Sequence, residues 1–492
     1  MRRIVVLALV AATAGCAVGP AYHRPPVGTP NAWRPPAASA DSLRPFFDSL
    51  RTSRDTLLPA GAGTARVSFA YDTTPRGLAW VDLLQDSVVR QLVDTSLRQN
   101  RDLQTALAAI REFRAQYRAA RGALLPELTA TGQAGRNQVA FGTLGAQTFD
   151  LYRATADLSW ELDVWGRIRR GTRAARADLT AREEDRRAIE LSLIGDVAIA
   201  YFDLRASDLN LAIATRTLDS RQQTLQLARR RLDQGVISEL DVRQFEAEVA
   251  SPAASVAGFQ REIAQQENAL SVLLGHYPGA VARGRTLPEM AAKIAVPAGV
   301  PSGLLANRPD VRSAEASLRA ATARVGVELA QRLPTFTITG QYGSQATTSD
   351  RWFTSGTDIW QAFVGVSIPL FTEGRPGGAG ERINVVRARA DQARARYEQT
   401  VLVAVREVED ALVTLRAAQD QAAAQQRQVV ALRRALELAG MRYQSGVASY
   451  LEVLDAQRGL FSAELALTQA ERDQLVAAVQ LYRAVGAGWP GS

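Results

Sequence analysis

An internal repeat is the sequence feature that most constrains the fold of this chain. The segment Leu125 to Gln133 (LPELTATGQ) returns as Leu333 to Gln341 (LPTFTITGQ). A second pair, Arg231 to Val242 and Arg442 to Val453, shares an arginine, a Gly-Val dipeptide, a serine and an apolar end. Each copy is roughly 190 residues long, whereas solenoid repeats are about 20 to 50 residues. Two units of this size predict one pseudo-symmetric object and not a stack of small repeats.

The N-terminus has the pattern of an export signal. Arg2 and Arg3 precede the apolar run 4–10, and small residues lead to Cys16, the only cysteine of the chain. A lone cysteine directly after such a run resembles the lipobox of bacterial lipoproteins, which implies lipidation of Cys16. The alternative is an ordinary signal peptide with an incidental thiol. In either case one cysteine excludes an intrachain disulfide.

The charge balance argues against nucleic acid as a partner. The net charge is +8 over 492 residues, and removal of the signal takes Arg2 and Arg3 with it. Almost all of the cations are arginines, and they form no basic block with interleaved aromatic residues. After the signal there is also no run of about 18 apolar residues, so we expect no membrane-spanning helix.

Four segments alternate between apolar and polar residues, as transmembrane β-strands do. In the clearest, 151–164, the even-numbered residues are apolar and the odd-numbered ones from Arg153 onward are polar or charged. The strands are expected at about 127–139, 150–165, 334–346 and 358–371. A soluble sheet with one solvated face is the alternative. Because four strands cannot close a barrel around water, either closure requires several chains or the strands do not span the membrane.

The longest segments between the strands are helical. The segment 167–232 contains no proline, and a second long helix is expected at about 379–443. Apolar residues repeat every seven positions along the first, with small residues on a neighbouring row, which predicts packing against other helices. The apolar row is Val197, Leu204, Leu211, Leu218, Leu225 and Leu232, and the small row is Ala200, Ser207, Ala214 and Ala228.

Each long helix is expected to end at a glycine turn and to be followed by a returning helix. Gly235 and Gly446 can adopt a positive φ, and Ser238 and Ser449 are placed to cap the helices that follow, about 239–274 and 450–485. Single helices at about 86–124 and 310–331 precede the two strand pairs. The fold class is therefore mainly α with a pair of β-hairpins, in duplicated units of helix, hairpin, long helix and helix.

This arrangement resembles the outer membrane factor family, the TolC-like exit ducts of tripartite efflux pumps, in its lipoprotein branch. The resemblance covers nearly the whole chain after the signal. Its local motifs are CAVGPAY from Cys16, NRPDV from Asn307, and YLEVLDAQR from Tyr450. Membership implies a homotrimer in the bacterial outer membrane, with a 12-stranded β-barrel on a 12-helix periplasmic tunnel. This assembly would supply the closure that four strands lack.

The resemblance also implies where the duct shuts and docks. The family's apolar and acidic constriction rings match Leu451 and Asp455, which lie one helical turn apart. Arg442 matches a residue that ties the closed tips together. The alternative is that all three are ordinary helix residues. The two tips would meet a periplasmic adaptor protein; they comprise Gly235, Val236, Ser238, Gly446, Val447 and Ser449.

We expect a passive channel and not an enzyme. With two histidines, three methionines and one cysteine, the sequence offers no metal site, and it contains no nucleophile motif or phosphate loop. No cofactor is expected beyond the lipid at Cys16. An inner-membrane pump, expected to be proton-driven, would power the efflux of small molecules. The alternatives are a type I protein secretion channel and, with less support, a periplasmic coiled-coil scaffold lipoprotein.

The expected organisation follows the repeat. Residues 1–15 are the signal and 16–85 a lipid-anchored equatorial segment, which contains an insertion at 41–64 that the resemblance does not explain. The first copy is 86–276, the linker 277–305, the second copy 306–486 and the tail 487–492.

Overall fold

A computed structural model describes residues 17–26, 86–140, 146–292, 308–372, 375–376 and 380–486. The expectations for the signal, Cys16 and the tail, for most of the equatorial segment and for linker residues 293–305 therefore lie outside the described residues. The chain divides into two compact units. The first comprises residues 1–27, 107–185 and 312–400, and the second comprises 28–106, 186–311 and 401–492. Among the described helices, none is apolar over a long enough stretch to cross a membrane.

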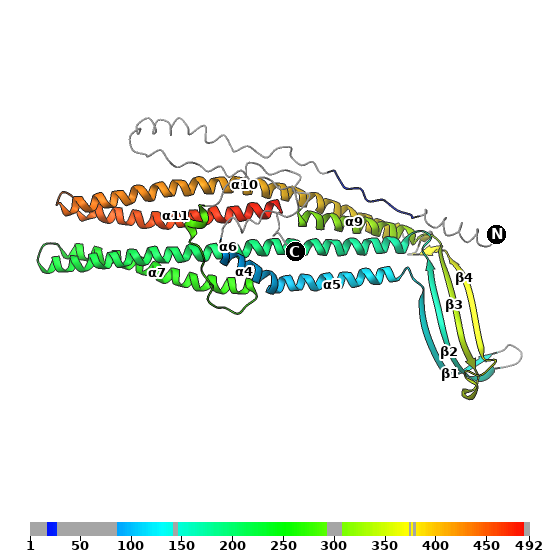
Figure 1. Cartoon of the computed structure of the whole chain (residues 1–492). Coiled ribbons are helices and arrows are strands. Elements are labelled where there is room, and N and C mark those ends of the chain that lie inside the picture. The colour runs from blue at the N-terminus through cyan, green and yellow to red at the C-terminus, as the bar shows by residue number, and fades with distance from the viewer. Residues whose placement is uncertain are drawn as a thin grey trace. The chain divides into compact units, whose positions relative to one another are not determined.

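The first unit contains one antiparallel sheet with the strand order β1-β2-β3-β4 (Figure 1). Its strands are β1 (Glu127–Ala140), β2 (Ala146–Leu162), β3 (Thr335–Ala346) and β4 (Asp358–Ser367). The two hairpins are joined by pairing between β2 and β3, for example Leu158 with Gly340. The strand expected to run to 371 ends at Ser367, because Pro369 lacks the N–H that a ladder hydrogen bond needs. Two short strands, β5 (Phe371–Thr372) and β6 (Arg375–Pro376), pair separately.

The register places the alternating residues of β2, β3 and β4 on two different faces. Directly paired residues share a face, and Asp157 pairs with Gln341, which pairs with Gln361. Hydrogen bonds connect this polar row: Arg153 donates to Gln341 Oε1 at 2.7 Å, and Gln361 Nε2 donates to the same oxygen at 2.8 Å. The opposite face carries the apolar even-numbered residues of β2. The sheet therefore has one polar face and one apolar face.

The helix expected at 86–124 is wrong as a single element, because it is interrupted at Asn100. The structure has α4 (Ser87–Gln99) and α5 (Arg101–Gly122). Asn100 Oδ1 accepts hydrogen bonds from the backbone N–H groups of Asp102 and Leu103, at 3.0 and 3.1 Å. Asparagine satisfies the free N–H groups of a new helix in this way. The side chain of Asn100 therefore caps the start of α5, directly after the end of α4.

Four helices form two long hairpins. The first joins α6 (Arg167–Asp233) to α7 (Glu239–Leu274), and the second joins α10 (Gly380–Gln444) to α11 (Tyr450–Val485). Figure 1 labels them together with α9 (Pro309–Ala330); α8 (Leu287–Ala291) is a short helix and η3 (Ser349–Arg351) a short 3₁₀ turn. The core of the second unit lies along α6, where Val197, Tyr201 and Leu204 are fully buried. The apolar period in the sequence thus indicated the buried stripe of α6.

Candidate gate and docking tips

Both tip turns are built on a glycine with positive φ. The φ angles are 70° at Gly235 and 72° at Gly446, a region that L side chains rarely adopt. Each turn closes its long helix with a backbone hydrogen bond, from Val236 N–H to Arg231 O at 2.9 Å and from Val447 N–H to Arg442 O at 3.0 Å. This bond spans five residues, as in a Schellman motif. The valines are 66% and 71% exposed, so each tip presents a small apolar surface.

The caps after the two turns differ. Ser238 and Asp241 form a capping box, in which Ser238 Oγ accepts from the Asp241 N–H at 3.2 Å and the Asp241 carboxylate accepts from the Ser238 N–H at 2.9 Å. Ser449 occupies the corresponding position before α11 but makes no side-chain cap hydrogen bond. The expectation of a capping serine is therefore right for α7 and wrong for α11. Glu452, three residues after Ser449, lies instead 3.4 Å from Arg442 Nε.

The three residues expected to form the gate lie close to the second tip. Leu451 is 62% exposed, and Asp455, one turn further along α11, is also exposed. Arg442 lies in the last turn of α10, and its ion pair with Glu452 joins the two helices of the hairpin. Leu451 therefore does not pack in the described part of the seam. The apolar and acidic side chains are available to partners outside this chain.

An aromatic cluster lies just below the tips and connects the two hairpins within the second unit. The Tyr450 ring is 4.4 Å from the Phe245 ring and 5.0 Å from the Tyr443 ring, centroid to centroid. Arg231 donates to Tyr443 Oη at 2.6 Å. Burial raises the pKa of Tyr450 to about 12, so its hydroxyl stays protonated at physiological pH. The start of α11, which carries Leu451, is thus held on a packed support.

A buried ion cluster deeper in the second unit was not anticipated from the sequence. Arg221 of α6 forms an ion pair with the Glu248 carboxylate at 2.8 Å and donates to the Glu248 backbone carbonyl, and both side chains are less than a tenth exposed. Arg458 of α11 donates through Nε to the other carboxylate oxygen at 2.6 Å. Burial is the largest influence on Arg221 and lowers its pKa, while the Glu248 carboxylate raises the pKa of Arg458. One glutamate of α7 therefore binds two other helices.

A sequence signal for this cluster did exist. Arg221 occupies the row of small residues along α6, seven positions after Ala214 and seven before Ala228. All three residues of this row are buried. An arginine in such a row needs a buried acid as its partner, because an unpaired buried charge is very costly. Glu248 similarly interrupts the apolar stripe of α7, between Phe245 and Pro252.

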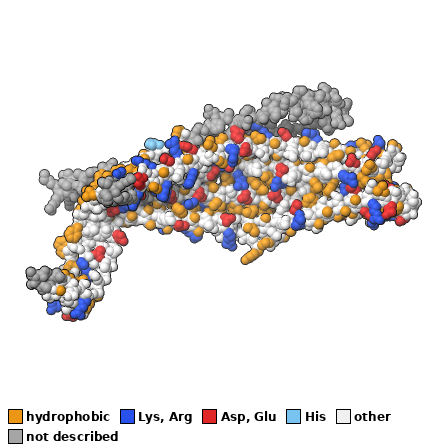
Figure 2. Space-filling model, turned by 180° about the vertical axis from the view of Figure 1, so that it is seen from behind, with side chains coloured by type: hydrophobic (Ala, Val, Ile, Leu, Met, Phe, Trp, Pro, Cys, Tyr) orange, Lys and Arg blue, Asp and Glu red, His pale blue; other side chains and the backbone are white. Residues whose placement is uncertain are grey.

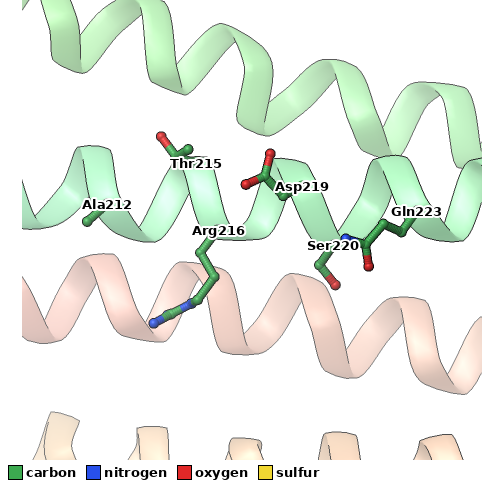
Figure 3. A pocket seen from close by; sticks show the side chains of 6 residues that line it. All are labelled: Ala212, Thr215, Arg216, Asp219, Ser220 and Gln223. Atoms are coloured by element: carbon green, nitrogen blue, oxygen red, sulfur yellow. The ribbon is translucent and has the colours of Figure 1, made fainter.

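A second cluster of the same composition connects α6, α10 and α11. Glu464 of α11 accepts from Arg216 at 2.7 Å and from Arg433 at 3.0 Å. Arg216 also lines an open groove of about 570 Å³ along α6, together with five other α6 residues. In Figure 3 Thr215 and Asp219 point to one neighbouring helix while Arg216 points to the opposite side. Five of its six lining residues are of polar or charged types, and they carry both signs of charge.

The described residues after Cys16 are bound tightly to the first unit. Arg170 of α6 donates to the carbonyl oxygens of Gly19 and Pro20 at 2.9 and 3.0 Å. The Val18 N–H donates to Trp165 O at 3.1 Å, next to the end of β2. A Cβ on Gly19 would lie 2.6 Å from the Gly326 backbone, so only glycine fits there. The chain that follows Cys16 is therefore fixed beside the junction of β2 and α6.

No group of three or more His, Cys, Asp or Glu side chains in the described ranges is arranged to hold a metal ion. Figure 2 shows basic, acidic and hydrophobic side chains interspersed along the visible face of the long helices. The main structural features of the described residues are the two tip turns, the ion clusters that connect helices, and a sheet with one polar and one apolar face.

The comparisons with known proteins identify the family. The profile described as "Outer membrane efflux protein" matches residues 92–276 and 300–487. The toluene efflux pump outer membrane protein TtgF of Pseudomonas putida is 34% identical over 489 residues, with 98% of this chain and 96% of that protein covered. The cation efflux system protein CusC of Escherichia coli is 30% identical, with 97% of each chain covered.

Solved structures agree with this assignment. The outer-membrane channel OprN has a TM-score of 0.82 at 32% identity, covering 97% of this chain and 100% of that one. The open state of the MtrE outer membrane channel of Neisseria gonorrhoeae has a TM-score of 0.79 at 28% identity, covering 96% and 98%. The chain belongs to the outer membrane efflux protein family and is an outer-membrane efflux channel. The family is one of outer-membrane channels and not of enzymes, and TtgF is named as the outer membrane protein of an efflux pump.

Proposed function

We propose that three copies of this chain form one continuous exit duct that carries small molecules passively from a periplasmic adaptor and an inner-membrane pump to the cell exterior. The observation that carries this proposal is the open sheet. Strands β1 and β4 each pair on one side only within the described chain, and β1 is exposed on both faces at 127–139. Long unpaired edges recruit further strands. Three sheets joined edge to edge give a twelve-stranded barrel, and their helices give a twelve-helix tunnel.

The two faces of the sheet support an orientation in this barrel. The row with Arg153, Asp157 and Gln341 is polar and internally hydrogen-bonded, as a water-filled lumen requires. The even-numbered row would face lipid. The boundaries expected from the sequence, 86–276 and 306–486 for the two copies and 277–305 for the linker, are proposed as the repeat units of this assembly.

Cys16 is proposed as the lipidated first residue of the mature chain. The support is the position of Ala17 to Pro20, which the Arg170 guanidinium binds beside the junction of β2 and α6. In the proposed barrel this junction lies at the periplasmic surface of the outer membrane. A diacylglyceryl group on Cys16 would there be within reach of the inner leaflet. Signal residues 1–15 would be removed before assembly.

The gate is proposed at Leu451, Asp455 and Arg442. Three exposed Leu451 side chains around the axis would exclude water, and three Asp455 carboxylates would repel anions and bind cations. Arg442 would hold the tip closed through its contact with Glu452. The test is the double substitution Asp455→Ala with Arg442→Ala in planar bilayers. The single-channel conductance should rise, and an unchanged conductance would contradict the gate.

The tips are proposed as the adaptor-docking surface, with Gly235, Val236 and Ser238 on one and Gly446, Val447 and Ser449 on the other. Both glycines have open space where a Cβ would stand, so a side chain would project outward. Replacing Gly446 by tryptophan should abolish efflux in cells while native mass measurements still find three chains. Retained efflux would contradict docking through this tip. We further propose that the inner-membrane pump is proton-driven. Collapse of the proton gradient by an uncoupler in the same cells should then stop efflux.

A further inference from the structure

The connection between β3 and β4, residues 347–357, folds back over one face of the sheet. The Phe353 N–H donates to Ser344 Oγ at 3.2 Å. The Trp352 ring lies 6.0 Å from the ring of Tyr152 in β2. Ser344 and Ala346 are only 3% and 7% exposed, although they lie near the end of the sheet. The connection therefore covers the last residues of β3 and does not extend freely from the strands.

The covered face is the apolar one. Tyr152 pairs with Ala346, and Tyr342 pairs with Trp360, so these even-numbered side chains share a face. The polar row with Asp157 and Gln341 lies on the other side. Tyr342 is 64% exposed and Trp360 77% exposed, so the same face presents further large aromatic rings two rows from the connection. The loop thus extends an exposed aromatic surface.

Phe353 has an unusual backbone that this loop maintains. Its φ of 66° is the only positive φ of a non-glycine residue in the described part of the chain. Its side chain is 69% exposed and stacks on Trp352, with ring centroids 5.0 Å apart and 19° between the planes. A strained conformation of this kind persists where surrounding contacts fix it, often for function. Glycine would relieve the strain, so the exposed ring itself requires an explanation.

The neighbouring hydrogen bonds hold the loop in this form. Thr354 Oγ1 donates to Arg351 O at 2.7 Å, and Thr357 Oγ1 donates to Thr354 O at 2.8 Å. A third bond of 2.8 Å joins Ser344 Oγ to Thr357 Oγ1. The backbone of the loop is therefore ordered before any partner binds. We call Tyr152, Trp352 and Phe353 the aromatic shelf.

The distance along the sheet from the row of Phe336 to the aromatic shelf matches the thickness of the apolar part of a bilayer. Phe336 and Ala346 lie ten residues apart in β3, which is about 34 Å along the strand. With the tilt of roughly 40° typical of membrane barrels, this becomes about 26 Å, close to the apolar band of about 25 Å. If the row of Phe336 lies at the periplasmic interface, the shelf lies at the outer one. Aromatic rings favour this level because one part meets acyl chains and another meets headgroups.

We propose that the aromatic shelf is a lipid-docking surface that contacts the headgroup and acyl boundary of the outer leaflet and sets the depth of the channel there. This rests on the proposed function, in which the sheet spans the outer membrane. Arg351 and Asp350 are exposed beside the shelf, and Figure 2 shows charged side chains gathered at this free end of the sheet. Charged residues just above the rings suit a boundary with water.

The test uses the full-length lipidated protein in vesicles of zwitterionic and anionic phospholipid, with a fluorophore on one introduced cysteine. Ser355→Cys keeps the shelf intact, and Phe353→Cys probes it directly. We expect a nitroxide near the headgroup to quench both at least about twofold more than one near the chain end. The control Ala362→Cys, in the middle of the apolar face, should be quenched more by the deep nitroxide. A fluorophore at Gln361→Cys, on the polar face, should be quenched by neither nitroxide.

The outcomes separate the two proposals. Quenching at Ala362→Cys without quenching at Phe353→Cys would overturn the shelf while the spanning sheet stands. Absence of quenching at Ala362→Cys would instead overturn the spanning sheet. A fluorophore at position 353 that is shielded from water but not quenched by either lipid would be covered by a neighbouring copy, which also overturns lipid docking.

A further variant tests the ring without labelling it. Phe353→Gly relieves the positive φ, so it should leave the thermal stability unchanged or higher. Combined with Ser355→Cys, it should reduce the headgroup-level quenching of the fluorophore at position 355. Quenching equal to that of Ser355→Cys alone would show that the exposed ring does not hold the loop against lipid.

Discussion

The two helical hairpins have nearly the same backbone but differ in what their side chains do. The helices α7 and α11 are each 36 residues long, and both tips turn on a glycine with positive φ. A shift of 211 residues, the spacing of Arg231 and Arg442, aligns their sequences. By that shift Arg221 corresponds to Leu432 and Glu248 to Gly459. In the first hairpin these two positions form a buried ion pair. In the second hairpin they form an apolar contact, in which Leu432 would lie 3.4 Å from a Cβ placed on Gly459.

The two hairpins differ in the contacts that their side chains make near the tips. The first has a capping box at Ser238 and a buried glutamate that binds helices on two sides. The second has an uncapped start, an exposed leucine and an exposed aspartate. Asp455 corresponds to Gln244, which is also exposed but neutral. The exposed acid therefore belongs to the hairpin whose returning helix starts without a side-chain cap.

The largest effect is expected from breaking the buried ion pair of the first hairpin. Glu248→Ala leaves the Arg221 guanidinium buried without a carboxylate, which should lower the free energy of unfolding by about 3 to 5 kcal/mol. The double variant Arg221→Leu with Glu248→Ala approaches the apolar pair of the second hairpin. It should recover most of that loss. Thermal unfolding of the purified channel measures both, and a double variant as unstable as the single one would contradict this explanation.

An intermediate effect is expected at Glu471 of α11. Burial raises its pKa from the ordinary value of 4.5 to about 7. The folded chain then holds this proton more tightly than the unfolded chain. The resulting stability is fully present below pH 4.5 and is lost as the pH rises through about 7. Glu471→Gln places at this position the residue type of its counterpart in the first hairpin, Gln260. The unfolding temperature of this variant should fall less than that of the unchanged protein between about pH 5 and about pH 8. Identical pH profiles for the two proteins would refute the assignment.

The smallest effect is expected at the caps. Ser238→Ala removes the capping box and should cost about 1 kcal/mol, seen as faster amide hydrogen exchange in the first turn of α7. Ser449→Ala should change exchange in α11 very little, because that serine makes no side-chain cap bond. Equal effects at the two positions would remove this distinction between the hairpins.

The sequence predicted the periodic parts of the fold better than its interruptions. The seven-residue row of leucines and the glycine turns follow directly from spacing, and the structure has long helices and tight turns there. The break at Asn100 was missed because its cause is one side-chain hydrogen bond, which an apolar pattern does not record. Arg221 interrupts the row of small residues along α6, and the spacing alone does not predict that it is buried. Its partner, Glu248, lies on another helix, so only the packing shows that the exception is a pair.

The site was predictable where it depends on local geometry and not where it depends on contacts between distant segments. Gly446 could be singled out from a turn motif and its repeat, whereas Leu451 was singled out only by the resemblance to the family. The support below them, where Tyr450 packs on Phe245, requires the return of α7 beside α11. The aromatic shelf is similar, because Trp352 meets Tyr152 only once β2 and β3 are in register. The roles assigned to Leu451, Asp455 and Arg442 stay predictions.

The central claim is that the acidic constriction belongs to the second hairpin alone, and ion selectivity tests it most directly. Reversal potentials in a potassium chloride gradient would be compared for the unchanged channel, Asp455→Gln, and Asp455→Gln combined with Gln244→Asp. We predict that Asp455→Gln loses most of the preference for cations and that Gln244→Asp does not restore it. An unchanged preference in Asp455→Gln, or full restoration by Gln244→Asp, would contradict the claim.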